Sequence, residues 1–134
     1  MSAQKPTRQP SLPAHAMRSL RGIDVDRLRE STRASGRQLV EVDLSGCDDR
    51  TAAMHAISSA FALPHWFGSN LDALYDALTD LGERGGAGVV VLLEHVPQAS
   101  RVFSEEQRRD LLQVFRDAVR HHKLSGFPLS VYYS

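Results

Sequence analysis

The chain contains little cysteine, no long apolar run and no excess of charge of either sign. Its 134 residues include one cysteine, Cys47, which excludes an internal disulfide and a metal site built from several thiolates. No apolar stretch approaches the roughly 20 residues that a membrane-spanning helix needs. Sixteen basic residues balance 16 acidic ones, which argues against a strongly basic nucleic-acid binder. These absences predict a soluble protein of a reducing, cytoplasmic compartment with no membrane contact.

The neutral total hides an asymmetry of charge along the chain. Residues 1–37 carry eight basic side chains against three acidic ones, a balance of +5. Residues 38–134 carry eight against 13, a balance of −5. No Lys or Arg occurs between Arg50 and Arg84. We therefore expect two parts, a basic N-terminal extension over 1–37 and an acidic domain over 38–134.

The extension is predicted to be only partly ordered. Residues 1–22 contain three prolines and few apolar side chains, so they are expected to be mostly disordered, and they lack the apolar core of a signal peptide. A short helix is predicted over about 24–34, because Asp24 is a good N-cap and Gly36 a good stop signal.

The second part alternates strand and helix patterns. Strands are predicted at Gln38–Leu44, at the apolar run Gly88–Leu93 and at Leu129–Tyr133. Two helical patterns lie between the first two strands, the first capped by Asp48 or Asp49 and the second running from a Ser69 cap to about Leu81. A third follows the S-x-x-Q capping box that begins at Ser104. The order β-α-α-β-α-β predicts an α/β fold, a three-stranded parallel sheet packed by three helices with right-handed connections.

One predicted helix combines regular acidic spacing with aromatic neighbours. Asp72, Asp76 and Asp80 recur every four residues, so they lie on one helix face and repel one another by about 0.2–0.5 kcal/mol per pair. Spacing alone leaves two interpretations open, a solvated face or a binding face. Tyr75 lies between two of the acids, and aromatic residues directly precede the helix. This mixture is typical of a surface that meets a basic, grooved partner.

The segment from Leu63 to Thr79, LPHWFGSNLDALYDALT, resembles the core motif of the barstar family of ribonuclease inhibitors. The family pattern is Leu-Pro, two aromatics, Gly-x-Asn-Leu-Asp-Ala-Leu, an aromatic and Asp. A second similarity is LQVFRD at 112–117 in the last predicted helix. The resemblance covers roughly 38–134, and residues 1–37 have no counterpart in it.

The resemblance implies an inhibitor whose motif helix and preceding loop close a ribonuclease active site. Asp76 would enter the phosphate-binding site, and Asp72 would contact the base-recognition region. Trp66 and Tyr75 would replace a tyrosine and a tryptophan of the family interface, and Asp117 a glutamate that pairs with an arginine. The implied partner-binding set is Trp66, Phe67, Gly68, Asn70, Asp72, Tyr75, Asp76, Thr79, Asp80 and Asp117.

Those replacements leave the identity of the partner open. The resemblance implies a 1:1 complex with a basic, guanyl-preferring microbial ribonuclease or with a related nuclease toxin of interbacterial competition. The protein would then be a bacterial immunity protein, acting in the cytoplasm in the manner of an antitoxin. It would be neither an enzyme nor the carrier of a cofactor.

Other functions receive less support from the residues. His121 and His122 are adjacent, so on a helix they diverge by about 100° and do not form a metal site together. The segment 85–88 lacks the lysine and helix of a phosphate loop, and Cys47 has no evident base beside it. The alternative function is a nucleic-acid-binding accessory protein acting through the basic residues of 1–37. A further hypothesis is that this basic segment covers the acidic helix until the nuclease displaces it.

Overall fold

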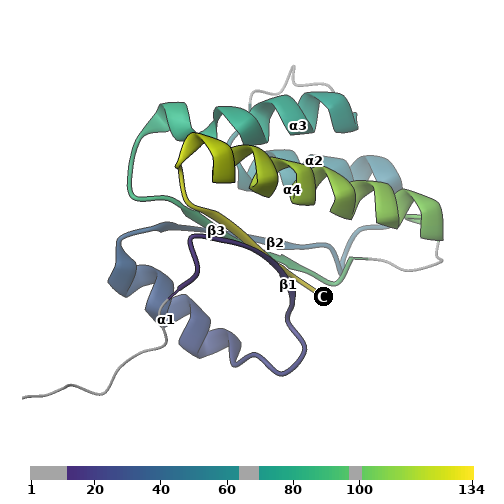
Figure 1. Cartoon of the computed structure of the whole chain (residues 1–134). Coiled ribbons are helices and arrows are strands. Elements are labelled where there is room, and N and C mark those ends of the chain that lie inside the picture. Colours follow the sequence, from purple (N-terminus) through teal and green to yellow (C-terminus); the bar gives the residue numbers. More distant parts are fainter. Residues whose placement is uncertain (1–11, 64–69, 97–100) are drawn as a thin grey trace, which may run out of the picture.

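The structure is a computed structural model that describes residues 12–63, 70–96 and 101–134 (Figure 1). Those residues form an alternating series of strands and helices. In chain order the elements are β1 (His15–Ser19), α1 (Val25–Ser35), β2 (Gln38–Asp43), α2 (Arg50–Ala60), α3 (Leu71–Thr79), the 3₁₀ helix η1 (Asp80–Arg84), β3 (Val89–Glu94), α4 (Glu105–Ser125) and β4 (Leu129–Tyr133).

The strands form one parallel sheet in the order β1-β4-β3-β2. The α/β class and the parallel pairing of the three predicted strands are confirmed. The predicted number of strands was wrong, because the described residues form a four-stranded sheet. The added strand, β1, lies within the segment 1–22 that was expected to be mostly disordered. None of the described helices is long and apolar enough to cross a membrane.

The strand β1 forms because of pairing with the far end of the chain. Its residues run in register with β4, from His15 opposite Leu129 to Ser19 opposite Tyr133. It is an edge strand, so only one of its sides is hydrogen-bonded to a neighbour, and of its five side chains only Ala16 is buried. A short segment with one buried side chain has almost no apolar pattern, which is why the sequence did not reveal it.

The central strand β3 is apolar throughout because both of its faces are covered. Val89, Val91 and Leu93 belong to the main core, whereas Val90 and Leu92 belong to a second apolar cluster on the other face. Each of the five is at most 3% exposed. The prediction of a strand buried on both faces is confirmed.

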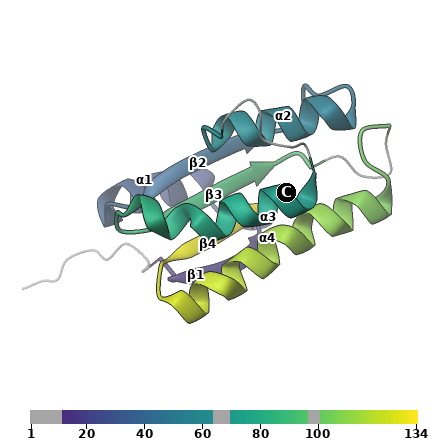
Figure 2. The same ribbon diagram turned by 90° about the horizontal axis from the view of Figure 1, so that it is seen from above.

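Three helices cover one face of the sheet, with α3 between α2 and α4 (Figure 2). Figure 1 shows that α3 lies farther from the sheet than α4, against which it packs. The main core between this layer and the sheet includes fully buried side chains of all three helices, among them Ile57, Leu74 and Phe115. The arrangement leaves the outer side of α3 on the surface of the molecule.

The helix α1 lies on the opposite face of the sheet (Figure 1). The connection from β1 to β2 runs across the sheet in one direction, and the connections from β2 to β3 and from β3 to β4 run in the other. Because all of these parallel connections are expected to be right-handed, the helix of the first connection lies on the opposite face from the helices of the later ones. The predicted helix is confirmed, with Asp24 accepting a hydrogen bond from the Arg27 backbone N–H at 3.2 Å and Gly36 ending it in the left-handed conformation.

For residues 12–37, this position contradicts the hypothesis that the basic segment covers the acidic helix. The sheet lies between α1 and α3, β1 is itself an edge strand of that sheet, and Leu28 of α1 packs into the second apolar cluster. Residues 1–11 lie outside the described residues. For the described part of the basic segment, the attraction between opposite charges is outweighed by burial of apolar surface on the other face of the sheet.

The predicted caps of α4 and α2 are confirmed, whereas the cap and the C-terminal end of α3 differ from the prediction. The reciprocal capping box of α4 is confirmed between Ser104 and Gln107, and Asp49 caps α2. The cap of α3 is Asn70 rather than Ser69, which itself lies outside the described residues. The regular α-helix ends at Thr79, and η1 continues the chain where the prediction extended the α-helix to Leu81.

Candidate partner-binding surface

The helix α3 is fixed by its cap and by its buried side. The Asn70 side-chain oxygen accepts a hydrogen bond from the Ala73 backbone N–H at 2.8 Å. Leu74 and Leu78 are at most 1% exposed and anchor the helix in the main core. Because the core side is held by side chains four residues apart, the polar residues between them face outward.

Asp72, Asp76 and Asp80 lie on the exposed side of this helix, as the spacing predicted. Among the described residues, none of the three carboxylates forms an ion pair or a side-chain hydrogen bond with another group. Asp72 is in the first turn, where the positive end of the helix dipole favours a carboxylate, but Asp80 is at the C-terminal end, where the dipole disfavours one. The helix therefore presents uncompensated negative charge to the solvent.

Tyr75 and Thr79 flank these acids and are both partly buried. The Thr79 hydroxyl donates to the Asp76 carbonyl oxygen at 2.9 Å, so its proton is engaged within the helix and its oxygen can still accept a hydrogen bond. Tyr75 has no side-chain hydrogen bond within the described chain. Its partly exposed side chain lies beside the acids on the helix.

Asp117 lies on α4, the helix that packs directly against α3. Its carboxylate accepts a hydrogen bond from the Gln113 side-chain amide at 2.8 Å and lies 3.9 Å from the Arg120 guanidinium. Gln113 also accepts a hydrogen bond from Arg116 at 3.1 Å. Asp117 is thus already held within a polar chain along α4, unlike the three acids of α3.

The remaining predicted contact residues, Trp66, Phe67 and Gly68, lie outside the described residues. They directly precede the Asn70 cap in the sequence.

A residue that sequence reasoning did not select holds the end of α3. His122 of α4 is 1% exposed, and its Nε2 lies 2.7 Å from the Leu78 carbonyl oxygen. A carbonyl only accepts, so the proton is on Nε2, and the Ser125 hydroxyl lies near Nδ1 at 3.4 Å. The ring also packs on Phe127, with ring centroids 5.3 Å apart. His122 therefore ties the last turn of α3 to α4.

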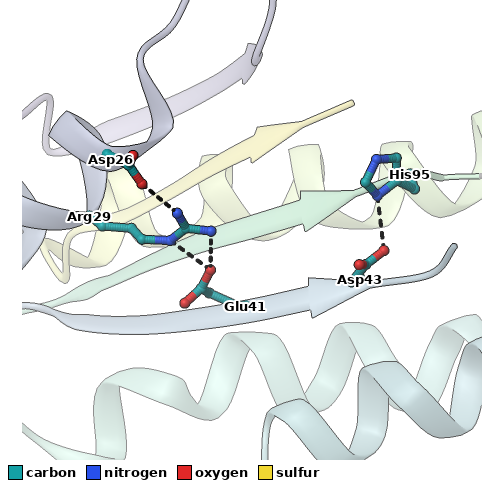
Figure 3. A network of polar contacts seen from close by, with 5 residues as sticks. All are labelled: Asp26, Arg29, Glu41, Asp43 and His95. Carbon is teal, nitrogen blue, oxygen red and sulfur yellow. Dashed lines mark hydrogen bonds and ion pairs between the residues drawn. The ribbon is translucent and has the colours of Figure 1, made fainter.

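Three further polar residues, Asp43, His95 and Cys47, lie outside α3 and belong to other parts of the fold. Figure 3 shows His95 pointing to Asp43, with 2.9 Å between Nδ1 and Oδ1. The Ser45 backbone N–H and, after it, His95 lower the pKa of Asp43. Burial and, after it, neighbouring aspartates raise the pKa of the Cys47 thiol, which disfavours the reactive thiolate.

No group of three or more His, Cys, Asp or Glu within the described ranges is arranged to hold a metal ion. The described surface around α3 offers carboxylates and an aromatic ring.

Comparison with known proteins identifies the domain. A family model described as Barstar (barnase inhibitor) matches residues 37–134. No curated protein matches the chain. The matched residues contain α2, α3, η1, α4 and the strands β2, β3 and β4. Both the acidic helix α3 and the His122 clamp, the hydrogen bond from His122 of α4 to the Leu78 carbonyl oxygen, therefore lie within them. Because the match covers most of the chain, the protein belongs to the Barstar family.

Proposed function

We propose that the protein inhibits a ribonuclease by placing the acidic side of α3 in the active site of the nuclease. The observation that carries this proposal is the row of three exposed carboxylates, Asp72, Asp76 and Asp80, that have no cationic partner among the described residues. The Barstar family consists of inhibitors rather than enzymes, and family membership supports a nuclease as the partner.

The chemistry of a ribonuclease active site explains why such a helix would fit it. An enzyme that cleaves a phosphodiester holds the substrate with Arg, Lys and protonated His, and a carboxylate can occupy the position of a phosphate on those groups. Asp76, central in the row, is the proposed occupant of the phosphate site. Asp72 would contact the base-recognition region, and Tyr75 would supply apolar contact area beside both.

Two features of the scaffold support binding without large rearrangement. The core anchors Leu74 and Leu78 and the hydrogen bond from His122 hold α3 along its length. A surface that is ordered before binding loses less conformational entropy in the complex. Its negative field would also speed association with a basic protein.

The partner is proposed to be a barnase-like, guanyl-preferring ribonuclease or a related nuclease toxin, bound 1:1. The protein would act in the bacterial cytoplasm as an immunity protein, protecting the cell from the nuclease. The proposed contact set is the ten residues given above, of which Trp66, Phe67 and Gly68 would extend the surface of α3 toward the preceding loop.

The first test is inhibition of nuclease activity by the full chain. We would assay RNA cleavage by barnase, by related basic ribonucleases and by any small nuclease encoded beside this gene. Asp76→Asn should weaken inhibition of the responsive nuclease by about 30-fold or more, because the variant leaves a desolvated cationic site without its counter-charge. Urea unfolding should show no loss of stability, since removing one of three like charges relieves repulsion on the helix.

The matched control is Glu30→Gln on α1, an exposed acid on the opposite face of the sheet that has no ion pair among the described residues. It should inhibit as the parent does. Equal inhibition by Asp76→Asn and the parent would refute the assigned role of α3. If the chain inhibited no nuclease and instead bound RNA in a salt-dependent manner that was lost with residues 1–37, the nucleic-acid alternative would replace the proposal.

A further inference from the structure

A cleft lies on the opposite side of the sheet from α3. It is bounded by α1, by the segment that precedes β1 and by the outer face of the sheet, and has a volume of about 260 Å³. Its apolar lining includes Leu12, Ile23 and Leu28, and its polar lining includes Arg18, Arg27 and Tyr132. This volume is slightly below the usual range of small-molecule sites, about 300–1,000 Å³, so only a compact ligand would fit.

Tyr132 is the unusual member of this lining. It lies on β4 directly opposite Arg18 of β1, so the two side chains share the α1 face of the sheet. The residue is 3% exposed. Within the described chain its hydroxyl has no hydrogen-bond partner, although a buried tyrosine hydroxyl usually has one. The cleft thus contains a buried donor with no acceptor among the described residues.

Two cations at the same cleft also have no partner in the described part of the chain. Arg29 of α1 is fully engaged, with Asp26 and Glu41 each at 2.9 Å, as Figure 3 shows. Arg37 donates to the Pro13 carbonyl oxygen at 2.8 Å. By contrast, the guanidinium groups of Arg18 and Arg27 form no hydrogen bond or ion pair in the described ranges.

The acid among the lining residues is Asp24, and it already has a structural role. Its Oδ1 accepts the Arg27 backbone N–H at 3.2 Å and caps α1. The balance of formal charge among the lining residues is therefore positive, with Arg18 and Arg27 against Asp24. An anion entering beside the two guanidinium groups would encounter favourable electrostatics.

We propose that this cleft binds a small organic anion, with its phosphate or carboxylate between Arg18 and Arg27, its apolar body against Ile23 and Leu28, and an acceptor atom on the Tyr132 hydroxyl. The site is separate from the proposed inhibitory surface, because the sheet lies between them. Its occupancy does not depend on the nuclease, so each proposal can fail without the other.

The test is a chemical-shift titration of the ¹⁵N-labelled full chain with simple probes. Phenyl phosphate and benzoate supply an apolar body with either anionic group, inorganic phosphate supplies charge alone, and phenol supplies the body alone. We expect saturable shifts at Ile23, Leu28 and Tyr132 with phenyl phosphate or benzoate, and binding at least fivefold tighter than with phosphate or phenol. The stronger of the two organic anions identifies the preferred anionic group.

Variants then assign the contacts. Tyr132→Phe removes only the donor and Arg27→Gln removes one charge, and each should weaken probe binding by about 3- to 10-fold. The control is Arg33→Gln, an exposed cation on the last turn of the same helix and outside the cleft, which should change binding less than twofold. All three variants should inhibit the nuclease as the parent does.

Two outcomes would overturn the proposal. One is the absence of saturable shifts with every probe. The other is that phosphate and phenyl phosphate bind equally tightly and that Arg27→Gln and Arg33→Gln weaken probe binding by the same factor. That result would describe a diffuse cationic surface and not a defined site. If a single-stranded RNA oligonucleotide bound tightly and in a salt-sensitive manner, and both variants weakened its binding equally, the surface would be assigned to nucleic acid instead.

Discussion

At the scale of single residues, position in the sheet determines the chemistry of buried polar groups. Tyr132 and Ser130 both lie on the α1 face of β4, and both are buried. The Ser130 hydroxyl donates to the Pro13 carbonyl oxygen at 3.0 Å, whereas the Tyr132 hydroxyl has no partner among the described residues. Burial raises the pKa of Tyr132, and the charges of Arg18 and Arg37 oppose that rise.

The raised pKa of Tyr132 predicts a loss of stability in alkali. The unfolded chain releases the tyrosine proton near pH 10, whereas the folded protein retains it to higher pH. The free energy of unfolding therefore falls as the pH rises above about 10, until the folded state also releases the proton. Urea unfolding of Tyr132→Phe and of the parent, followed from pH 7 to 11, measures this difference.

At pH 7 the free energy of unfolding of Tyr132→Phe should equal that of the parent or exceed it by up to about 1 kcal/mol, because the variant lacks a buried hydroxyl that has no partner among the described residues. Its advantage should grow above pH 10. A parallel pH dependence of the two proteins would show that Tyr132 does not titrate differently in the folded state.

At the scale of elements, α3 carries an exposed row of aspartates and is held at its end by a residue that lies far away in the sequence, His122 of α4. The row is visible in the sequence because helical geometry is local, with a period that places residues four apart on one face. The sequence does not reveal the His122 clamp. Two adjacent histidines near the end of a helix can equally be explained as cations that stabilise the negative end of the helix dipole. Only the packing of α4 on α3 places the imidazole under the Leu78 carbonyl.

Replacing His122 should loosen α3 within an otherwise folded protein. His122→Ala removes a buried ring and leaves the Leu78 carbonyl without its donor, so we expect a loss of about 2–4 kcal/mol in the free energy of unfolding. Hydrogen exchange should accelerate most in the last turn of α3. The neighbouring variant His121→Ala is the control, because His121 is exposed and should change stability little. Equal effects of the two variants would contradict the clamp.

At the scale of the whole molecule, the family match and the folded unit have different boundaries. The match begins at residue 37, but β1 and α1 precede it and cover one edge and one face of the sheet. Val90 and Leu92 are fully buried in the apolar cluster on that face. The expectation of a separate domain over 38–134 stays a prediction, and these contacts indicate how it can be tested.

A chain that begins at residue 37 should be less stable than the full chain. It exposes the apolar cluster around Val90 and Leu92, and uncovering even two such side chains removes about 3 kcal/mol or more of stability. The urea midpoint should fall by roughly 1–2 M. Inhibition of the nuclease should persist below the new midpoint, since α3 lies on the other face. An unchanged midpoint would mean that residues 1–36 are an independent extension.

The sequence by itself determined those features that depend on neighbouring residues: the helix caps, the apolar strand β3, the acidic row of α3 and the motif that places the chain in the Barstar family. The tertiary structure alone decided the features that depend on distant segments. The strand β1 exists through pairing with β4, α1 occupies the second face through the direction of its crossover, and His122 and Tyr132 acquire their surroundings through packing. Local geometry follows from bonds and periodicity, whereas the surroundings of a side chain arise only when the chain folds back on itself.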